Sequence, residues 1–394
     1  MSECVSISPE ELMSHRPSLF ALCLVGVVLL TSCTTGSTSD EASAEIVIGE
    51  YGSLTGTTAT FGISTKNGID MAVDEVNKAG GLLGKKVRVV VEDDQGKPEE
   101  AQTVVTKLIN RDKVVALLGE VASSNSMAAA PAAQQAGIPM ISPSSTNSQV
   151  TEVGDYIFRV CFIDPFQGLV MAKFAADTLK VKNVAILRDI KSDYSVGLAD
   201  VFVENFKKMG GTIVADESYT AGDTDFSAQL TSMKAKKPEA IFLPGYYTEV
   251  GLVARQAKKG GLTIPLLGGD GWDSPRLIEI GGKDLDGSYF SNHYSVDDPS
   301  PAIQKFVAEY KARYGAVPDA LAGLGYDSAM VLFDAIRRSN STEGAKIRDA
   351  IASTKDFPGV TGKINIDQYR NAVKPAVVLQ VKGGKLQYVE TINP

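Results

Sequence analysis

From Glu45 onward, short β-branched runs alternate with helical patterns, and this alternation constrains the fold more than any other feature of the sequence. In one helical stretch Ile69, Val73 and Val76 recur at helical spacing before a Gly80-Gly81 stop. Strands that alternate with helices are typical of a parallel sheet covered by helices. The apolar runs predicted as strands are 46–48, 87–91, 114–118, 140–141, 184–187, 213–214, 241–243 and 266–267.

The length of 394 residues exceeds what one hydrophobic core usually serves, so two lobes are expected. After about residue 290 the pattern changes to two helical segments, 302–314 and 320–338, followed by further strands. Polar joints that carry proline or glycine offer crossing points between the lobes. We therefore predict an α/β fold of two doubly wound parallel-sheet lobes joined by a multi-strand hinge. The predicted N-terminal lobe comprises 45–164 and 295–358, and the C-terminal lobe comprises 165–294 and 359–394.

The N-terminal segment has the pattern of an export signal. Leu19–Leu30 is apolar but shorter than the about 20 residues that span a bilayer, which is typical of a secretory signal. The next residues, Leu30-Thr31-Ser32-Cys33, resemble a bacterial lipobox, whose cysteine is lipidated. We predict a lipoprotein signal peptide over 1–32, lipid attachment at Cys33 and a flexible tether over 33–44.

Charge and cysteine content argue against several classes of function. Lys+Arg 39 against Asp+Glu 47 gives a net charge of −8 without a basic run, which argues against a nucleic-acid partner. Cys4 and Cys23 leave with the signal and Cys33 carries lipid, so Cys161 stands alone in the folded part. One thiol forms neither a disulfide nor a cysteine-based metal site, and Cys161 is expected to pack as a buried hydrophobe.

The sequence also lacks the pattern of a hydrolase. Of the two histidines His15 lies in the signal, and no Gly-x-Ser-x-Gly elbow occurs. His293 is expected to be a hydrogen-bonded residue near a lobe crossing. A surface hydrolase that uses Asp93 and His293 is a disfavoured alternative, and we predict neither an enzyme nor a bound metal or cofactor.

Hydroxyl-rich segments follow two of the predicted strands in the first lobe, at 120–126 and at 142–147. Ligands in open α/β sheets bind at the carboxyl ends of the strands, where free N–H groups and hydroxyls can cradle a carboxylate. Helix capping explains one such residue per helix, so these clusters alone leave capping and anion binding both open. Glu120, at the same edge, is interpreted as a solvated charge without a partner.

The second lobe places different residues at its strand ends. Tyr194, the pair Tyr246-Tyr247 and Trp272 suit a partly apolar pocket around a small molecule. Asp270 stands between glycines, where it can meet a cation. A carboxylate cradle opposite an acid and aromatic rings has the polarity of an amino-acid zwitterion. Both charges of an enclosed zwitterion need partners, because an unpaired buried charge is costly.

Several segments resemble the type I periplasmic-binding-protein family, specifically the branched-chain (Leu/Ile/Val) amino-acid-binding proteins of ABC importers. The resemblance covers essentially all of residues 45–394. The similar segments are 68–77 with 80–84, 137–143, 151–159, 167–168, 193–194 and 325–327.

The resemblance implies a set of ligand-binding residues. Ser123 and Thr146 would hold the ligand carboxylate. The Ser144 carbonyl, the Thr146 hydroxyl and Asp270 would take the ammonium. Leucine binders of the family usually have Glu at the position of Asp270, so the shorter side chain implies a longer or water-bridged contact. The pocket for the ligand side chain would be lined by Phe61, Val121, Tyr194 and Tyr246, with Ser145 close by.

The function implied is that of an extracytoplasmic substrate-binding lipoprotein of an ABC importer. It would capture a small amino acid, branched-chain or otherwise aliphatic, between two closing lobes and deliver it to permease and ATPase subunits. A lipid anchor would be its only attachment to the membrane. Two alternatives remain: the same fold binds an amide, urea or another small metabolite, or the protein is a ligand sensor rather than a transport receptor.

Overall fold

The computed structural model describes residues 45–394, so the predicted signal peptide and the whole predicted tether, which begins at Cys33, lie outside the described residues. The N-terminal lobe is built on a five-stranded sheet of order β2-β1-β3-β4-β5 with parallel pairing throughout. The strands are β1 (Glu45–Gly52), β2 (Lys86–Asp93), β3 (Leu117–Leu118), β4 (Met140–Ser142) and β5 (Ile157–Arg159). The helices of this stretch are α1 (Ala59–Lys78), α2 (Pro98–Asn110), α3 (Ser123–Ala136) and α4 (Gln149–Glu152).

The C-terminal lobe is built on a seven-stranded sheet of order β14-β13-β10-β9-β8-β6-β7. Its first five strands along the chain pair in parallel, whereas β13 and β14 add an antiparallel edge. The strands are β6 (Asn183–Asp189), β7 (Thr212–Tyr219), β8 (Ala240–Phe242), β9 (Leu266–Gly268), β10 (Tyr289–Asn292), β13 (Ala376–Lys382) and β14 (Lys385–Ile392). The helices are α5 (Asp164–Lys173) with the π-turn Phe174–Thr178, α6 (Asp193–Lys208), α7 (Ser227–Ala235), α8 (Tyr247–Lys259) and α9 (Pro275–Gly281), with 3₁₀ turns at Asp270–Trp272 and Gly282–Leu285.

Between β10 and β13 the chain returns to the first lobe. It forms α10 (Pro301–Tyr314), α11 (Ala320–Ser339), α12 (Gly344–Ala352) and the hairpin β11 (Phe357–Gly359) and β12 (Gly362–Ile364). The segments 160–163, 293–300 and 365–375 thus connect the two lobes. The predicted fold class of two α/β lobes is confirmed, with the antiparallel edge of the second sheet as an addition.

The lobe boundaries remain a prediction, and one contact bears on them. The backbone N–H groups of Val360 and Thr361 donate to the Asp327 carboxylate of α11 at 2.7 and 2.9 Å. The β11–β12 hairpin is therefore bonded to a helix that packs against α1 of the N-terminal lobe, although residues from 359 onward are predicted to belong to the C-terminal lobe.

Local sequence explains most element boundaries. Helix α1 ends before Gly80 and Gly81, which adopt positive φ values of 101° and 83° as the predicted stop requires. The predicted strand 114–118 is regular only at Leu117–Leu118. Its earlier residues still bond to β1, because Val115 N–H donates to the Val47 carbonyl at 2.9 Å.

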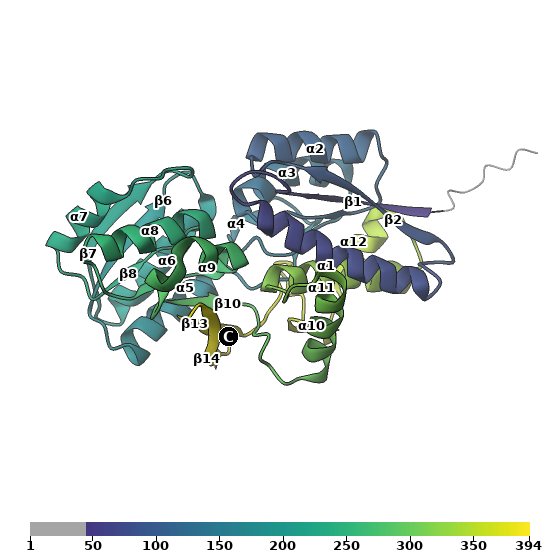
Figure 1. Ribbon diagram of the computed structural model, residues 1–394. Helices are drawn as coiled ribbons and strands as arrows, with labels where there is room; N and C mark the ends of the chain where they lie inside the picture. The colour runs from purple at the N-terminus through teal and green to yellow at the C-terminus, as the bar shows by residue number, and fades with distance from the viewer. Residues whose placement is uncertain (1–44) are drawn as a thin grey trace, which may run out of the picture. The chain divides into compact units, whose positions relative to one another are not determined.

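Helices α1 and α11 lie side by side, although more than 200 residues separate them in the sequence (Figure 1). Two glycines permit the close approach. A Cβ on Gly68 would overlap the carbonyl oxygen of Ala322, and a Cβ on Gly325 would overlap that of Thr65. Because an added Cβ would clash with the rigid backbone of the other helix, a larger residue at either position forces the helices apart.

We predict that Gly68→Ala lowers the free energy of unfolding by about 1–3 kcal/mol, the usual cost of overpacking. Urea denaturation followed by circular dichroism measures this. The matched control is Lys78→Ala on the exposed end of the same helix, which should change stability by less than about 0.5 kcal/mol. Equal stability of both variants would show that the α1–α11 contact is not tight.

Candidate ligand-binding site

Residues from both lobes line one small cavity at the lobe contact, with a volume of about 10 Å³. In this closed structure it has room for about one water molecule, so a larger ligand needs the lobes further apart than they are here. Most of the lining residues follow carboxyl ends of strands, as expected for open α/β sheets. The N-terminal lobe contributes Phe61, Val121, Ser144, Thr146 and Leu321, and the C-terminal lobe contributes Tyr194, Tyr246, Asp270 and Gly271.

Aromatic rings form one wall of this cavity. Tyr194 stacks on Tyr246 with ring centroids 5.4 Å apart and planes 4° from parallel. Phe61 meets Tyr246 edge-on at 5.4 Å, which brings an N-terminal ring against a C-terminal one. The Tyr194 hydroxyl accepts the Gly271 N–H at 3.1 Å. Burial raises the pKa of Tyr194 and of Tyr246 well above the ordinary value, so both rings are neutral and suit an apolar group.

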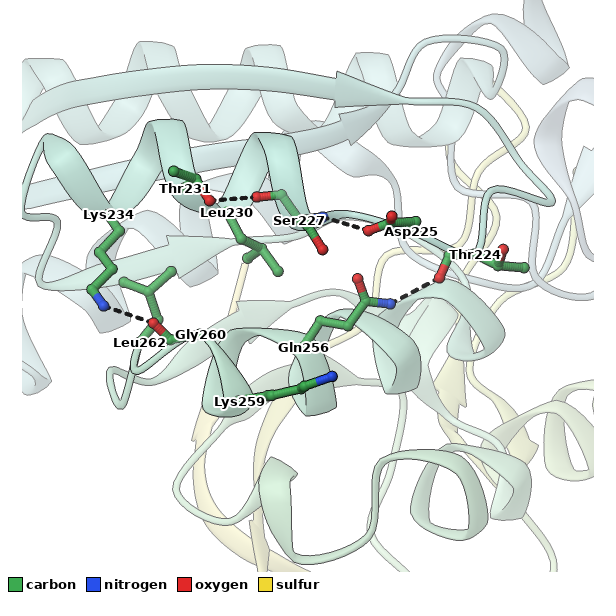
Figure 2. Close-up of a pocket in the computed structure, with 10 residues that line it drawn as sticks. All are labelled: Thr224, Asp225, Ser227, Leu230, Thr231, Lys234, Gln256, Lys259, Gly260 and Leu262. Carbon is green, nitrogen blue, oxygen red and sulfur yellow. Dashed lines mark hydrogen bonds between the residues drawn. The ribbon is translucent and has the colours of Figure 1, made fainter.

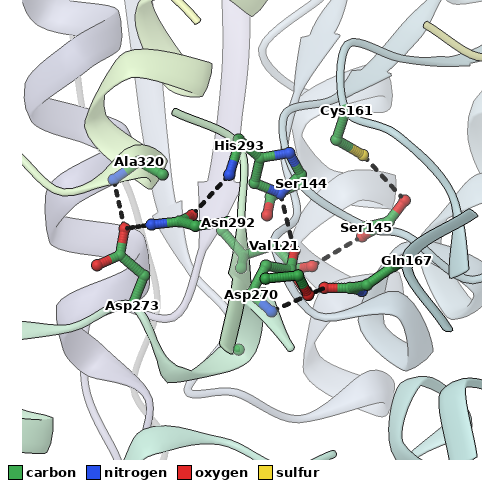
Figure 3. A network of polar contacts seen from close by, with 12 residues as sticks. Val121, Ser144, Ser145, Cys161, Gln167, Asp270, Asp273, Asn292, His293 and Ala320 are labelled. Carbon is green, nitrogen blue, oxygen red and sulfur yellow. Dashed lines mark hydrogen bonds and ion pairs between the residues drawn. The ribbon is translucent and has the colours of Figure 1, made fainter. Parts of the chain in front are cut away.

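Asp270 supplies the acidic end of the cavity (Figure 3). Its Oδ2 lies 2.9 Å from His293 Nε2, and its backbone N–H donates to Gln167 Oε1 at 2.8 Å. Its Oδ1 has no hydrogen-bond partner among residues 45–394, although only 5% of the residue is exposed. A buried carboxylate oxygen without a partner is costly, so this atom is suited to receive a cation.

Thr146 supplies a hydroxyl at the same cavity. Its Oγ1 forms no hydrogen bond of ordinary geometry within the part of the chain that the structure describes. The nearest acid is Asp164, whose N–H donates to the Thr146 carbonyl at 2.9 Å. Burial and the neighbouring Asp270 raise the pKa of Asp164 to about 7, while the nearby Thr146 hydroxyl lowers it. The cavity therefore holds both an acceptor and a donor that await a polar ligand.

Two predicted site residues do not reach the cavity wall. Ser123 Oγ accepts the Asn147 N–H at 3.2 Å. Ser145 Oγ donates to the Val121 carbonyl at 3.0 Å and lies 2.7 Å from Ser126 Oγ. Both hydroxyls form hydrogen bonds between the two strand-end loops, 120–126 and 142–147. The structure thus brings together Phe61, Val121, Ser144, Thr146, Tyr194, Tyr246 and Asp270, but neither Ser123 nor Ser145.

The interpretation of Glu120 as a solvated charge is wrong. Its carboxylate is buried, and Oε1 accepts the N–H of Ser53 at 3.1 Å and its hydroxyl at 3.0 Å. The Ala122 N–H donates to the other oxygen. Burial and the charge of Asp94 raise the pKa of Glu120 well above its ordinary range. Glu120 therefore stabilises the loop beneath Val121 from inside the lobe.

Trp272 was also expected at the pocket, and this is wrong. The indole is fully buried and donates its Nε1–H to the Leu243 carbonyl at 3.0 Å. It packs beside Phe290 with ring centroids 5.8 Å apart. Trp272 thus belongs to the core of the C-terminal lobe. Its apolar bulk indicated burial, but the sequence did not show which way the ring points.

The expectation for His293 is confirmed, since it is buried, hydrogen-bonded and the first residue of the segment 293–300 that connects the lobes. Cys161 is buried as predicted, and burial raises the pKa of its thiol to about 12. Leu321 was missed as a cavity residue. It lies in the first turn of α11, and the only signal was an apolar residue two positions after the capping Asp319.

Hydrogen bonds between the lobes surround the cavity, so the structure is closed. Separation of the lobes is therefore needed for a ligand to enter or leave. The bonds join Thr60 Oγ1 to Ser274 Oγ (2.8 Å), Thr248 Oγ1 to the Thr57 carbonyl (2.9 Å), Asn147 Nδ2 to the Asp193 carbonyl (2.8 Å) and Ser124 Oγ to Asp193 Oδ2 (2.7 Å).

A larger hollow lies between α7 and α8, away from the lobe contact (Figure 2). Two of its polar side chains, Lys234 and Gln256, are already bonded. Lys234 Nζ donates to the Gly260 carbonyl at 2.7 Å, and Gln256 Nε2 donates to the Thr224 carbonyl at 2.8 Å. The cavity between the lobes differs because polar atoms of Asp270 and Thr146 there have no hydrogen-bond partner among the described residues.

Three buried acids near the site predict how stability depends on pH. Burial is the main cause that raises the pKa of Asp94 to about 6 and of Asp164 and Asp319 to about 7, against about 3.9 in an unfolded chain. The folded protein therefore binds more protons than the unfolded chain between about pH 4 and 7. The free energy of unfolding should rise, by on the order of 2 kcal/mol, from pH 7.5 to pH 5.5.

His293 and Lys374 oppose this trend, because burial lowers the pKa of His293 and lowers that of Lys374 to about 8. Urea titrations at the two pH values measure the difference. Asp319→Asn removes one titrating group and should flatten the dependence. A protein that is equally stable or more stable at pH 7.5 would contradict the prediction.

Comparison with known proteins assigns the family. A family model described as periplasmic binding protein matches residues 45–385. A Leu/Ile/Val-binding protein of Rhizobium johnstonii is 33% identical over 325 residues, which are 82% of this chain and 88% of the relative. The crystal structure of the leucine-binding protein LivK from Thermotoga maritima has 42% identity and a TM-score of 0.86, covering 89% of this chain and 99% of that one. The isoleucine complex of LivJ from Streptococcus pneumoniae has 37% identity and a TM-score of 0.85, covering 89% and 100%.

Among residues 45–394, none of the helices has the length and apolar character that crossing a bilayer takes. The family comprises binding proteins, and its model spans both lobes of this structure. Since the model and the relatives match over most of its length, the chain belongs to the periplasmic binding protein family.

Proposed function

We propose that this protein is the extracytoplasmic substrate-binding component of an ABC importer and binds a branched-chain or other small aliphatic amino acid between its lobes. The observation that carries the proposal is the cavity, where the unpartnered Asp270 Oδ1 and Thr146 Oγ1 share one space with an aromatic wall. A relative named as a Leu/Ile/Val-binding protein and the isoleucine complex of LivJ support the same class of ligand.

The ammonium of the ligand binds at Asp270. A charged amine satisfies Oδ1, and the Ser144 carbonyl and Thr146 hydroxyl line the same cavity as further acceptors. The shorter reach of Asp, compared with Glu, leaves room for a bridging water. Charge-assisted hydrogen bonds of this kind are about twice as strong as neutral ones.

The carboxylate binds at the hydroxyl-rich loops of the N-terminal lobe. Helix α3 begins at Ser123, and the first N–H groups of a helix lack partners within it. The Thr146 hydroxyl is therefore the donor at the cavity wall that we assign to the carboxylate. The Ser123 N–H does not line the cavity in this closed structure, and we assign it as the second donor once the lobes move apart to admit the ligand. The aliphatic side chain then packs against the rings of Phe61, Tyr194 and Tyr246.

Ligand binding stabilises the closed state, because only in that state does the ligand touch both lobes. The permease and ATPase subunits of the importer recognise this closed form, and the ligand itself undergoes no reaction. A lipid on Cys33 would hold the protein at the outer side of the membrane.

Isothermal titration calorimetry on protein that lacks residues 1–32 tests the ligand class, since this protein keeps every described residue. L-Leucine, L-isoleucine and L-valine should bind at micromolar concentration or below. 4-Methylpentanoate lacks the ammonium, and 3-methylbutylamine lacks the carboxylate. Each should bind at least about 100-fold more weakly than leucine, because one set of buried polar groups stays unpaired. Failure of every L-amino acid to bind would reject the proposal.

We predict that Asp270→Asn weakens amino-acid binding by about 1.5–3 kcal/mol, the range for a hydrogen bond to a charged group. The same calorimetric titration measures the dissociation constant. Asp225→Asn, at the surface hollow between α7 and α8, is the matched control and should bind as the unchanged protein does. Unchanged affinity in Asp270→Asn would remove Asp270 from the site.

We also predict that Cys33 carries the lipid. The full-length chain, expressed in a bacterium with a clickable fatty acid, should be labelled and should sediment with membranes. Cys33→Ser should lose both properties, whereas Cys4→Ser should keep them. Labelling of Cys33→Ser would contradict the lipobox.

A further inference from the structure

His293 contacts the one acid that lines the ligand cavity. Its Nε2 lies 2.9 Å from Asp270 Oδ2, and both side chains are almost completely excluded from solvent (Figure 3). The carboxylate thus has one oxygen on the imidazole and the other, Oδ1, without a partner in the described part of the chain. His293 does not line this cavity, so any effect on the ligand passes through Asp270.

The hydrogen-bond inventory defines the protonation state of the ring. An ionised carboxylate only accepts hydrogen bonds, so Nε2 carries the hydrogen. Nδ1 has no partner among residues 45–394, and an imidazolium would leave a second buried N–H group unsatisfied. The ring is therefore the neutral tautomer with its proton on Nε2.

The surroundings of His293 favour the same state. The titratable groups that face it are Asp270, Asp273 and Lys374. Burial is the largest cause that lowers the pKa of His293, and the Lys374 ammonium lowers it further, whereas the two acids raise it. On its flat side the ring stacks on Phe162, with centroids 3.9 Å apart and planes 23° from parallel.

We infer that His293 is the positioning residue of the ammonium site: a neutral imidazole that holds Asp270 by Oδ2, leaves Oδ1 to the ligand and does not compensate the carboxylate with a positive charge. A neutral donor achieves this where a cation would not. An imidazolium would compensate the carboxylate within the protein and remove the charge that an ammonium ligand needs. The inference rests on the proposed function, because it assigns the mechanism of the same amino-acid site.

Two substitutions separate this role from packing. His293→Phe keeps an aromatic ring for Phe162 but removes the donor. His293→Gln replaces the ring and offers an amide N–H at about the same reach. We expect His293→Phe to weaken binding of the tightest amino acid by about tenfold or more, and His293→Gln to stay within about threefold of the unchanged protein. Binding of 4-methylpentanoate, which has no ammonium, should change little in either variant.

Equal loss in both variants, or a parallel loss for 4-methylpentanoate, would assign His293 to packing and overturn the inference. So would unchanged affinity in His293→Phe. Thermal unfolding of each variant checks that it is folded. If the unchanged protein binds no amino acid, the proposed function itself fails. That outcome differs from failure of this inference, in which the unchanged protein binds an amino acid and the two variants lose affinity equally.

A measurement without ligand tests the ring directly. In protein that lacks residues 1–32, His293 is the single histidine, so ¹⁵N-histidine labelling gives one imidazole in the NMR spectrum. The neutral tautomer protonated on Nε2 should be present at pH 7. A charged ring, or a proton on Nδ1, would overturn the inference.

Discussion

One buried carboxylate governs the chemistry of this protein. Asp270 is enclosed between the lobes, one of its oxygens is held by His293, and the other has no partner in the described part of the chain. A negative charge on a carboxylate in that position needs a cation as its partner, because desolvation of the charge costs several kcal/mol. The lobes supply no such cation at the cavity wall, which is lined by aromatic, aliphatic and hydroxyl groups besides Asp270. A positively charged group of the ligand is therefore the partner that Asp270 requires.

The same constraint links binding to the hinge. Asp270 belongs to the C-terminal lobe, whereas Thr146 belongs to the N-terminal lobe, so a zwitterion engages both only when they meet. His293 and Phe162, which stack on each other, lie in two of the segments that connect the lobes. The residue that holds the acid is thus part of the hinge itself. A change of hinge geometry is therefore expected to move the Asp270 carboxylate. Conversely, an ammonium bound to that carboxylate is expected to restrain the hinge.

Sequence reasoning located residues correctly where backbone topology alone determines their place in the fold. It failed where the direction of a side chain determines whether the residue reaches the cavity. The alternation of strands and helices predicted both sheets. The rule that ligands sit at strand ends indicated the segment 142–147 and Asp270, the family resemblance singled out Thr146 within that segment, and Thr146 and Asp270 line one cavity. Trp272 follows the same strand end yet turns into the core, and Glu120 turns inward to loop amides. Leu321 was missed because its helix returns from far along the chain. Such directions depend on packing between distant segments, which no local pattern records.

The distribution of charge around the cavity explains why a zwitterion fits better than a carboxylic acid or an amine with only one of the two charged groups. Burial favours the neutral forms of Tyr194, Tyr246 and His293, so the wall near Asp270 adds no further charge from these groups. A simple carboxylic acid would add a second negative charge beside Asp270. An amine would satisfy Asp270 but leave the hydrogen of the Thr146 hydroxyl without an acceptor. An amino acid satisfies both groups, and its carboxylate binds neutral donors, which stabilise an anion without attracting the ammonium away from Asp270.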